Sequence, residues 1–194
     1  MIPRQIRRHL WGMPEHELLV LGAITHALRP DRIVEFGTFT GASTLAMALN
    51  SPSHTRIVTV DVDPADRPGH VHGLGVGLIE FRIGEVFKDT AWHAKIEQRL
   101  CDTRQFTMPE WEGQVGLFLV DADHTYDFVR SDTAFANTML SPRGAIVWHD
   151  YTWSPDAAEC GGVTRAVNQF HQRHGNCFQI AGTRFAIYLN TPRA

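Results

Sequence analysis

The sequence predicts an α/β fold built on a doubly wound, mostly parallel sheet. Short apolar runs alternate along the chain with amphipathic segments of helical period, a pattern typical of βαβ units. The chain has no internal repeat and no low-complexity linker, and its 194 residues suit one domain. We therefore expect a single domain over residues 1–194, with a helical lead-in over residues 1–30.

Seven apolar runs are expected to form strands. Five of them lead towards one edge of the sheet: Arg32 to Phe36, Arg56 to Asp61, Ile96 to Leu100, Val115 to Val120 and Gly144 to Trp148. The last two are a terminal pair, Phe178 to Ile180 and Phe185 to Leu189. Since only residues 181–184 join this pair, we expect a hairpin and hence an antiparallel strand at the end of the sheet.

Four amphipathic segments are expected to be helices. The first begins at Pro14, where a first-turn proline belongs, and ends before Pro30. The others run from Ala42 to about Leu49, from Tyr126 to Leu140 and from Val163 to His174. Residues 64–80 interrupt this alternation with a segment rich in proline and glycine, for which we expect a loop that covers a substrate as a lid.

Composition and charge exclude several classes of protein. Hydrophobic residues make up 43% of the chain and charged residues 20%, so a disordered, collagen-like or coiled-coil chain is a poor match. The net charge of -3 argues against nucleic acid or an anionic membrane as a partner, and no apolar run is long enough to span a membrane. The three cysteines are odd in number and widely spaced, which favours a reducing compartment. We expect a cytoplasmic protein with a small-molecule partner.

The first expected strand leads into a turn that contains two glycines. Gly37 and Gly41 stand between Phe36 and the helix that starts near Ala42. Glycines at such a turn let a ligand approach the backbone, and the N-terminus of the helix favours anionic groups. The pattern lacks the third glycine of the dinucleotide fingerprint, so a nicotinamide cofactor is disfavoured. A plain tight turn is the alternative.

Acidic residues end the next two strands. Asp61 closes the second strand about twenty residues further on, where a carboxylate can accept hydrogen bonds from a ribose diol. Together with the glycine turn, it implies an adenosine ligand. Asp102 follows the third strand at the same edge of the sheet, with a helix cap as its alternative role.

Two further strands deliver polar clusters to this edge. Asp121 and His124 follow the fourth strand, and His149 and Asp150 follow the fifth. Carboxylates suit Mg²⁺, while an imidazole shifts the preference towards Mn²⁺, Fe²⁺, Co²⁺ or Zn²⁺. An aspartate after a strand is more commonly a cap or turn residue, so a metal site is the sharper of two interpretations.

With these motifs, the chain resembles the class I S-adenosylmethionine-dependent methyltransferases, which have a Rossmann-like sheet. Within them it is similar to the metal-dependent O-methyltransferases of small molecules, such as catechol and natural-product sugar O-methyltransferases. The resemblance covers nearly the whole chain, with the matching segments Val34 to Ser43, Val58 to Asp61, Cys101 to Thr103, Val120 to His124, Gly144 to Tyr151 and Gly182 to Tyr188.

The resemblance implies a role for each matching residue. Cofactor-binding positions are Glu35, Gly37, Thr38, Gly41, Ser43, Asp61, Asp102 and Asp121: the early ones shape the methionine pocket, Asp61 binds the ribose and Asp102 lies at the adenine edge. The metal-ligand positions are Asp121, His149 and Asp150, although many relatives carry a carboxylate in place of His149. His124 stands where relatives have a lysine or histidine general base, so His124 and Asp121 are the expected catalytic residues.

We therefore expect an enzyme that methylates a hydroxyl group of a small molecule, such as a sugar or secondary metabolite. Its cofactors would be S-adenosyl-L-methionine and a divalent metal, Mg²⁺ or Mn²⁺. Two other functions are considered: a metal-dependent hydrolase or oxygenase that uses the Asp/His cluster, and a non-catalytic nucleotide-binding subunit. The sequence is also compatible with a homodimer.

Overall fold

The computed structural model describes residues 12–63, 82–152 and 160–191. The expected lid over residues 64–80 and the first eleven residues of the expected lead-in lie outside the described residues.

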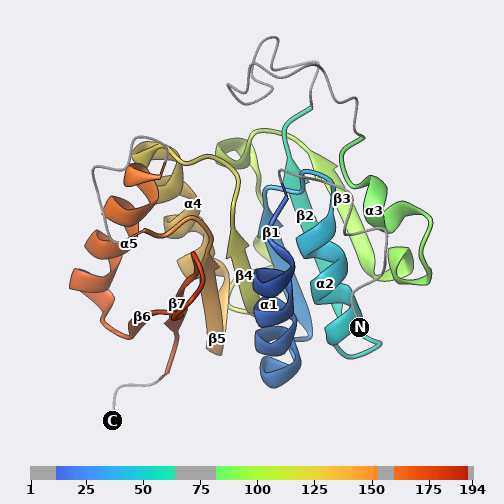
Figure 1. Ribbon diagram of the computed structural model, residues 1–194, viewed down its shortest axis with the longest axis horizontal. Coiled ribbons are helices and arrows are strands. Elements are labelled where there is room, and N and C mark those ends of the chain that lie inside the picture. The colour runs from blue at the N-terminus through green and yellow to red at the C-terminus, as the bar shows by residue number, and fades with distance from the viewer. Residues whose placement is uncertain (1–11, 64–81, 153–159, 192–194) are drawn as a thin grey trace.

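A seven-stranded sheet forms the centre of the domain (Figure 1), with the strand order β3-β2-β1-β4-β5-β7-β6. The strands are β1 Arg32–Phe36, β2 Arg56–Asp61, β3 Ile96–Leu100, β4 Val115–Val120, β5 Leu140–Trp148, β6 Cys177–Gln179 and β7 Ala186–Leu189. The first five pair in parallel, whereas β7 runs antiparallel to both β5 and β6. The predicted fold class is confirmed, with the antiparallel strand inserted between β5 and the edge strand β6.

Helices cover both faces of the sheet (Figure 1). They are α1 Glu15–Leu28, α2 Ala42–Asn50, α3 Glu85–Lys88, α4 Tyr126–Met139 and α5 Gly161–His174. The first three pack on one face and the last two on the other. In β1, Ile33 belongs to the core between the sheet and helices α1, α2 and α3, whereas Val34 and Phe36 belong to the core between the sheet and helices α4 and α5. Because β1 is buried on both faces of the sheet, its sequence is apolar on both sides rather than alternating. No helix of the described residues is long and apolar enough to cross a membrane.

The boundary between α4 and β5 differs from the sequence prediction. The helix ends at Met139, and β5 begins at Leu140 rather than at Gly144. Leu140 is buried and pairs with Val115, and the register between β4 and β5 then shifts before Leu117. The helical period includes Leu140, but its pairing with β4 is a tertiary contact that the local pattern does not contain.

The backbone pairing continues past the ends of β1, β4 and β5. The amide of Gly37 donates to Val60 O at 2.8 Å, and that of Asp121 donates to Phe36 O at 2.8 Å. The amide of His149 donates to Val120 O at 3.2 Å. These bonds hold the polar residues that follow the strands in the register of the sheet, so they converge at one edge.

Candidate active site

The two glycines of the β1–α2 turn are required by backbone packing. Gly37 has φ +97°, and a Cβ atom there would lie 2.0 Å from the carbonyl oxygen of Asp121. Gly41 has φ +89°, and its Cβ atom would lie 2.5 Å from the Phe87 ring. Glycine alone tolerates this combination of positive φ and close contact. The turn therefore lies directly against the start of the β4–α4 loop.

Beneath this turn, the carboxyl group of Glu35 is fully buried and binds three hydroxyl groups. Ser43 Oγ donates to Oε1 at 2.5 Å, Thr59 Oγ1 donates to Oε2 at 2.6 Å, and Thr44 also donates to Oε2. Thr38 joins through a 2.6 Å contact between its Oγ1 atom and that of Thr59. Burial raises the pKa of Glu35 to about 7, although the three hydroxyl donors act in the opposite direction.

The hydroxyl cluster connects the start of α2 to β1 and β2. It contains three of the predicted cofactor-binding residues, Glu35, Thr38 and Ser43, whose side chains are buried. Their side chains thus shape the turn from below. Any direct contact between these three residues and a ligand stays a prediction.

Asp61 lies beside the same turn at the end of β2. Its Oδ2 accepts a hydrogen bond from the amide of Phe39 at 2.8 Å, and its Oδ1 accepts one from the amide of Val62 at 2.8 Å. Each carboxylate oxygen has a second lone pair that can accept from a ligand hydroxyl. This half-buried carboxylate beside the turn fits the ribose-bearing ligand that the sequence predicts.

Asp102 acts as a helix cap. Its Oδ1 accepts from the amide of Arg104 at 2.9 Å, and its Oδ2 pairs with the Arg104 guanidinium at 2.7 Å. These bonds begin the short 3-10 helix Thr103–Gln105. This is the alternative role that the sequence offered, and a place at the adenine edge stays a prediction.

Asp121, His149 and Asp150 come together at the ends of β4 and β5. One potential ligand atom from each lies within 4.8 Å of the others. His149 Nδ1 lies 3.2 Å from Asp121 Oδ1 and 3.3 Å from Asp150 Oδ2. The three residues predicted as metal ligands therefore form one cluster, as the adjacency of β4 and β5 predicts.

Two further residues complete this cluster, and the sequence analysis missed both. Glu17 of α1 is 1% exposed, and its Oε2 lies 2.9 Å from His149 Nε2. Its Oε1 accepts from the amide of Arg184 at 2.6 Å. The Arg184 guanidinium donates to Asp150 Oδ1. One signal was available for Glu17: it directly precedes Leu18 and stands four residues before Leu21, so it belongs to the buried stripe of an amphipathic helix.

The charges of the cluster stabilise one another. Burial alone would lower the pKa of His149, but the carboxylates of Asp121, Asp150 and Glu17 raise it to about 12. Burial acts to raise the pKa of Asp150, yet hydrogen bonds from His124 and His149 hold it well below its ordinary value. The pKa of Glu17 is likewise lowered, because the bonds from His149 and Arg184 outweigh the effect of burial. The protonated imidazole of His149 thus balances the charge of the three carboxylates around it.

The donor set fits a divalent cation. Carboxylates alone would suit Mg²⁺, whereas two carboxylates together with an imidazole shift the preference towards Mn²⁺, Fe²⁺, Co²⁺ or Zn²⁺. His149 turns Nδ1 towards the two aspartates while Nε2 faces Glu17, which is how a carboxylate commonly orients a ligating histidine.

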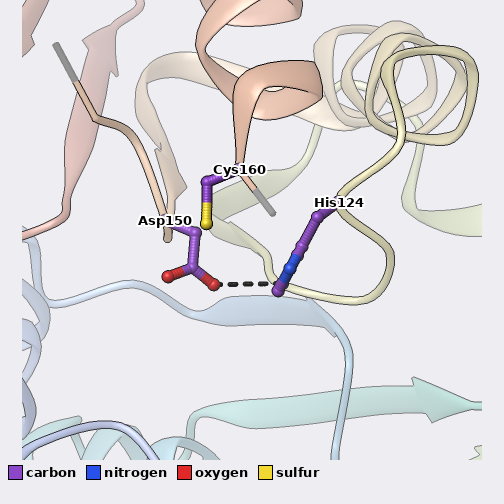
Figure 2. Close-up of side chains that lie close together, drawn as sticks. All are labelled: His124, Asp150 and Cys160. Atoms are coloured by element: carbon purple, nitrogen blue, oxygen red, sulfur yellow. Dashed lines mark ion pairs between the residues drawn. The ribbon is translucent and has the colours of Figure 1, made fainter. Parts of the chain in front are cut away.

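His124 lies next to this cluster, on the loop between β4 and α4 (Figure 2). Its Nε2 atom is 3.0 Å from Asp150 Oδ2, and its side chain is 34% exposed. The hydrogen bond to Asp150 raises the pKa of His124 above its ordinary value, and burial opposes that change. Asp150 has φ +58°, in the left-handed region that non-glycine residues seldom adopt. A half-exposed imidazole paired with a buried carboxylate can accept a proton from a bound molecule.

A family comparison identifies the class of protein to which this fold and site belong. The family described as "Methyltransferase domain" matches residues 34–151, which is more than half of the chain. The chain therefore belongs to this methyltransferase family. The matched range contains the glycine turn and all of Asp61, Asp121, His124 and Asp150. No curated protein sequence matches the chain.

Solved structures share the fold. The O-methyltransferase TomG from Streptomyces achromogenes, involved in tomaymycin synthesis and solved with SAM, is 18% identical, with a TM-score of 0.69 over 93% of this chain and 82% of its own. The Podospora anserina methyltransferase PaMTH1, solved with SAH, is 15% identical, with a TM-score of 0.71 over 99% and 89% of the two chains. A Bacillus cereus O-methyltransferase with SAH is 16% identical, with a TM-score of 0.66 over 96% and 82%. At these identities the likeness establishes a common fold.

Proposed function

We propose that this protein transfers a methyl group from S-adenosylmethionine to a hydroxyl oxygen of a small molecule, such as a sugar or secondary metabolite, with a divalent cation at Asp121, His149 and Asp150. The observation that carries the proposal is the convergence, at one sheet edge of a methyltransferase domain, of the glycine turn with this His/carboxylate cluster. The O-methyltransferases of similar fold that were solved with SAM or SAH support the choice of donor.

The donor would lie over the β1–α2 turn. The positive φ angles of Gly37 and Gly41 shape this turn, and the N-terminus of α2 favours the carboxylate of the methionine part. Asp61 would accept hydrogen bonds from the ribose hydroxyls. The contact between Gly37 and Asp121 places this turn directly beside the cluster, so the donor and the acceptor hydroxyl can meet across it.

His124 would accept the proton of the acceptor hydroxyl. An alcohol is a poor nucleophile until that proton is lost, and a divalent cation, when bound, lowers the pKa of the hydroxyl. The carboxylate of Asp150, 3.0 Å from His124 Nε2, stabilises the imidazolium that results. The acceptor oxygen then forms a bond to the methyl carbon as the bond between that carbon and sulfur breaks, and the sulfur keeps the electron pair.

Glu17 and Arg184 would position these groups without touching substrate. Glu17 holds the ring of His149 through Nε2, which leaves Nδ1 directed at the aspartates. Arg184 binds Asp150 Oδ1 and leaves Oδ2 to His124 and His149. Both contacts fix the ring and carboxylate planes on which proton transfer depends.

Isothermal titration with S-adenosylmethionine tests this proposal, with and without Mn²⁺ or Mg²⁺ and after chelation. Micromolar donor binding is expected. Asp61→Ala should chiefly weaken donor binding, whereas Asp121→Ala should remove metal-dependent transfer to hydroxylated acceptors. Asp127→Ala, at an exposed acidic residue of α4, is the control.

Absence of donor binding under every metal condition would overturn the proposal. Tight metal binding in that case would favour the metal-dependent hydrolase or oxygenase. Equal loss of donor binding in Asp61→Ala and Asp121→Ala would contradict the division of roles between these two residues.

A further inference from the structure

A second cluster of potential ligands shares Asp150 with the first. His124, Asp150 and Cys160 each bring one potential ligand atom within 4.8 Å of the other two. Figure 2 shows Cys160 and Asp150 as neighbours, with the His124 ring joined to the Asp150 carboxylate by the ion pair. His124 lies on the β4–α4 loop, Asp150 follows the end of β5, and Cys160 directly precedes α5. Cys160 is in no disulfide and is half-buried.

Close packing of α5 holds Cys160 at this position. A Cβ atom at Gly162 would lie 2.2 Å from His124 O and 2.5 Å from Tyr126 N, so the first turn of α5 lies directly on the loop that carries His124. The carbonyl of Cys160 accepts hydrogen bonds from the amides of Val163 and Thr164 at 3.1 and 3.2 Å, which begins the helix.

The segment after β5 is tied to the same helix. Thr164 Oγ1 donates to Thr152 O at 2.7 Å, and the amide of Tyr151 donates to Arg184 O at 2.9 Å. Asp150 is therefore held between α5 and the strand pair that ends the sheet. Backbone contacts therefore help to fix the positions of His124 and Cys160 beside the carboxylate.

The donor set of this cluster differs chemically from that of Asp121, His149 and Asp150. It offers a thiolate, an imidazole and a carboxylate, which are the ligands of Zn²⁺ sites in proteins. Sulfur has little affinity for Mg²⁺ and a high affinity for Zn²⁺. Three protein ligands with a fourth position open to solvent is also the usual composition of an accessible zinc site.

We propose that His124, Asp150 and Cys160 form a second cation site that selects thiophilic divalent ions, above all Zn²⁺. Binding replaces the hydrogen bond between His124 Nε2 and Asp150: the proton on Nε2 leaves to solvent or to Nδ1, and the thiol proton of Cys160 leaves to solvent, with no change of oxidation state. Because the ion takes up the His124 nitrogen, Zn²⁺ inhibits methyl transfer. This inhibition rests on the function proposed above, whereas the existence of the site does not.

Cobalt spectroscopy on the full-length, chelator-treated protein tests the site without any assay of activity. Co²⁺ bound to a thiolate gives a near-ultraviolet charge-transfer band that carboxylate and imidazole ligands do not give, and Zn²⁺ should displace it. We expect the band in the wild type and in Cys177→Ser, whose half-buried thiol on β6 serves as the matched control. Cys160→Ser should lack the band.

Zinc affinity, measured by competition with a chromophoric chelator, gives a second reading. Cys160→Ser should weaken Zn²⁺ binding at least about tenfold, while Cys177→Ser should leave it unchanged. Circular dichroism and thermal unfolding confirm that both variants are folded. Absence of the cobalt band in the wild type, or its persistence in Cys160→Ser, would overturn the proposed site.

Inhibition is tested by titrating turnover with Zn²⁺ at saturating Mg²⁺ or Mn²⁺. The concentration of Zn²⁺ that halves turnover should be at least about tenfold higher for Cys160→Ser than for Cys177→Ser. Equal inhibition of the two variants would show that zinc acts elsewhere. The cobalt band needs no methyl donor, so failure of the proposed methyl transfer and failure of this site are separate results.

Discussion

Loss of the buried Glu17 carboxylate should destabilise the domain strongly. Glu17→Ala leaves His149 Nε2 and the amide of Arg184 without their acceptor at a place where Glu17 is 1% exposed and His149 5% exposed. Removing one partner of a buried ion pair costs about 3–5 kcal/mol where the remaining charge is left uncompensated. Because Asp121 and Asp150 still face His149, we expect the lower end of this range, about 3 kcal/mol, which for a domain of this size lowers Tm by roughly 6–12 °C.

The free energy of unfolding, measured by urea denaturation, checks this magnitude. Glu17→Gln keeps an oxygen that can accept from the Arg184 amide but removes the charge, so we expect a smaller loss of about 1–3 kcal/mol. Glu15→Ala, an exposed acidic residue of the same helical turn, is the control and should change stability by less than about 1 kcal/mol. If Glu17→Ala were no less stable than Glu15→Ala, the reasoning on the buried ion pair would be refuted.

Two further predictions concern the β1–α2 turn. Burial raises the pKa of Glu35 from 4.5 to about 7, so the native state holds a proton that the unfolded chain releases, and stability falls as pH rises through this range. Glu35→Gln cannot titrate at this position, so its free energy of unfolding relative to wild type should increase by up to about 3 kcal/mol between pH 4.5 and 7. Urea denaturation at several pH values measures this difference, and a difference independent of pH would contradict the prediction. Gly37→Ala places a Cβ atom 2.0 Å from Asp121 O at φ +97° and should cost at least about 2 kcal/mol of stability, together with donor affinity. A thermal shift of less than a degree in that variant would argue against the close contact.

The sheet was predictable because its central strands are buried on both faces. The bounds of β1 to β4 agree with the sequence prediction, since each strand is a short run with a polar residue or turn at its end. The short helices around Glu85–Lys88 and Thr103–Gln105 were not predicted. They are too brief to show a period, and the second depends on the cap that Asp102 forms with Arg104.

The sequence by itself determined the α/β class, the glycine turn and the edge at which Asp121, His124, His149 and Asp150 meet. Polar residues that directly follow buried parallel strands must lie at the carboxyl edge of the sheet, so the order of residues along the chain contains that information.

Only the tertiary structure decided which side chains these residues contact. Glu17 reaches His149 across 132 residues and Arg184 across 167, and Cys160 reaches Asp150 because α5 packs on the His124 loop at Gly162. Such pairs depend on how helices lie on the finished sheet. The hydrophobic period places Glu17 on the buried face of its helix, but it does not show that His149 and Arg184 are the residues that Glu17 contacts there.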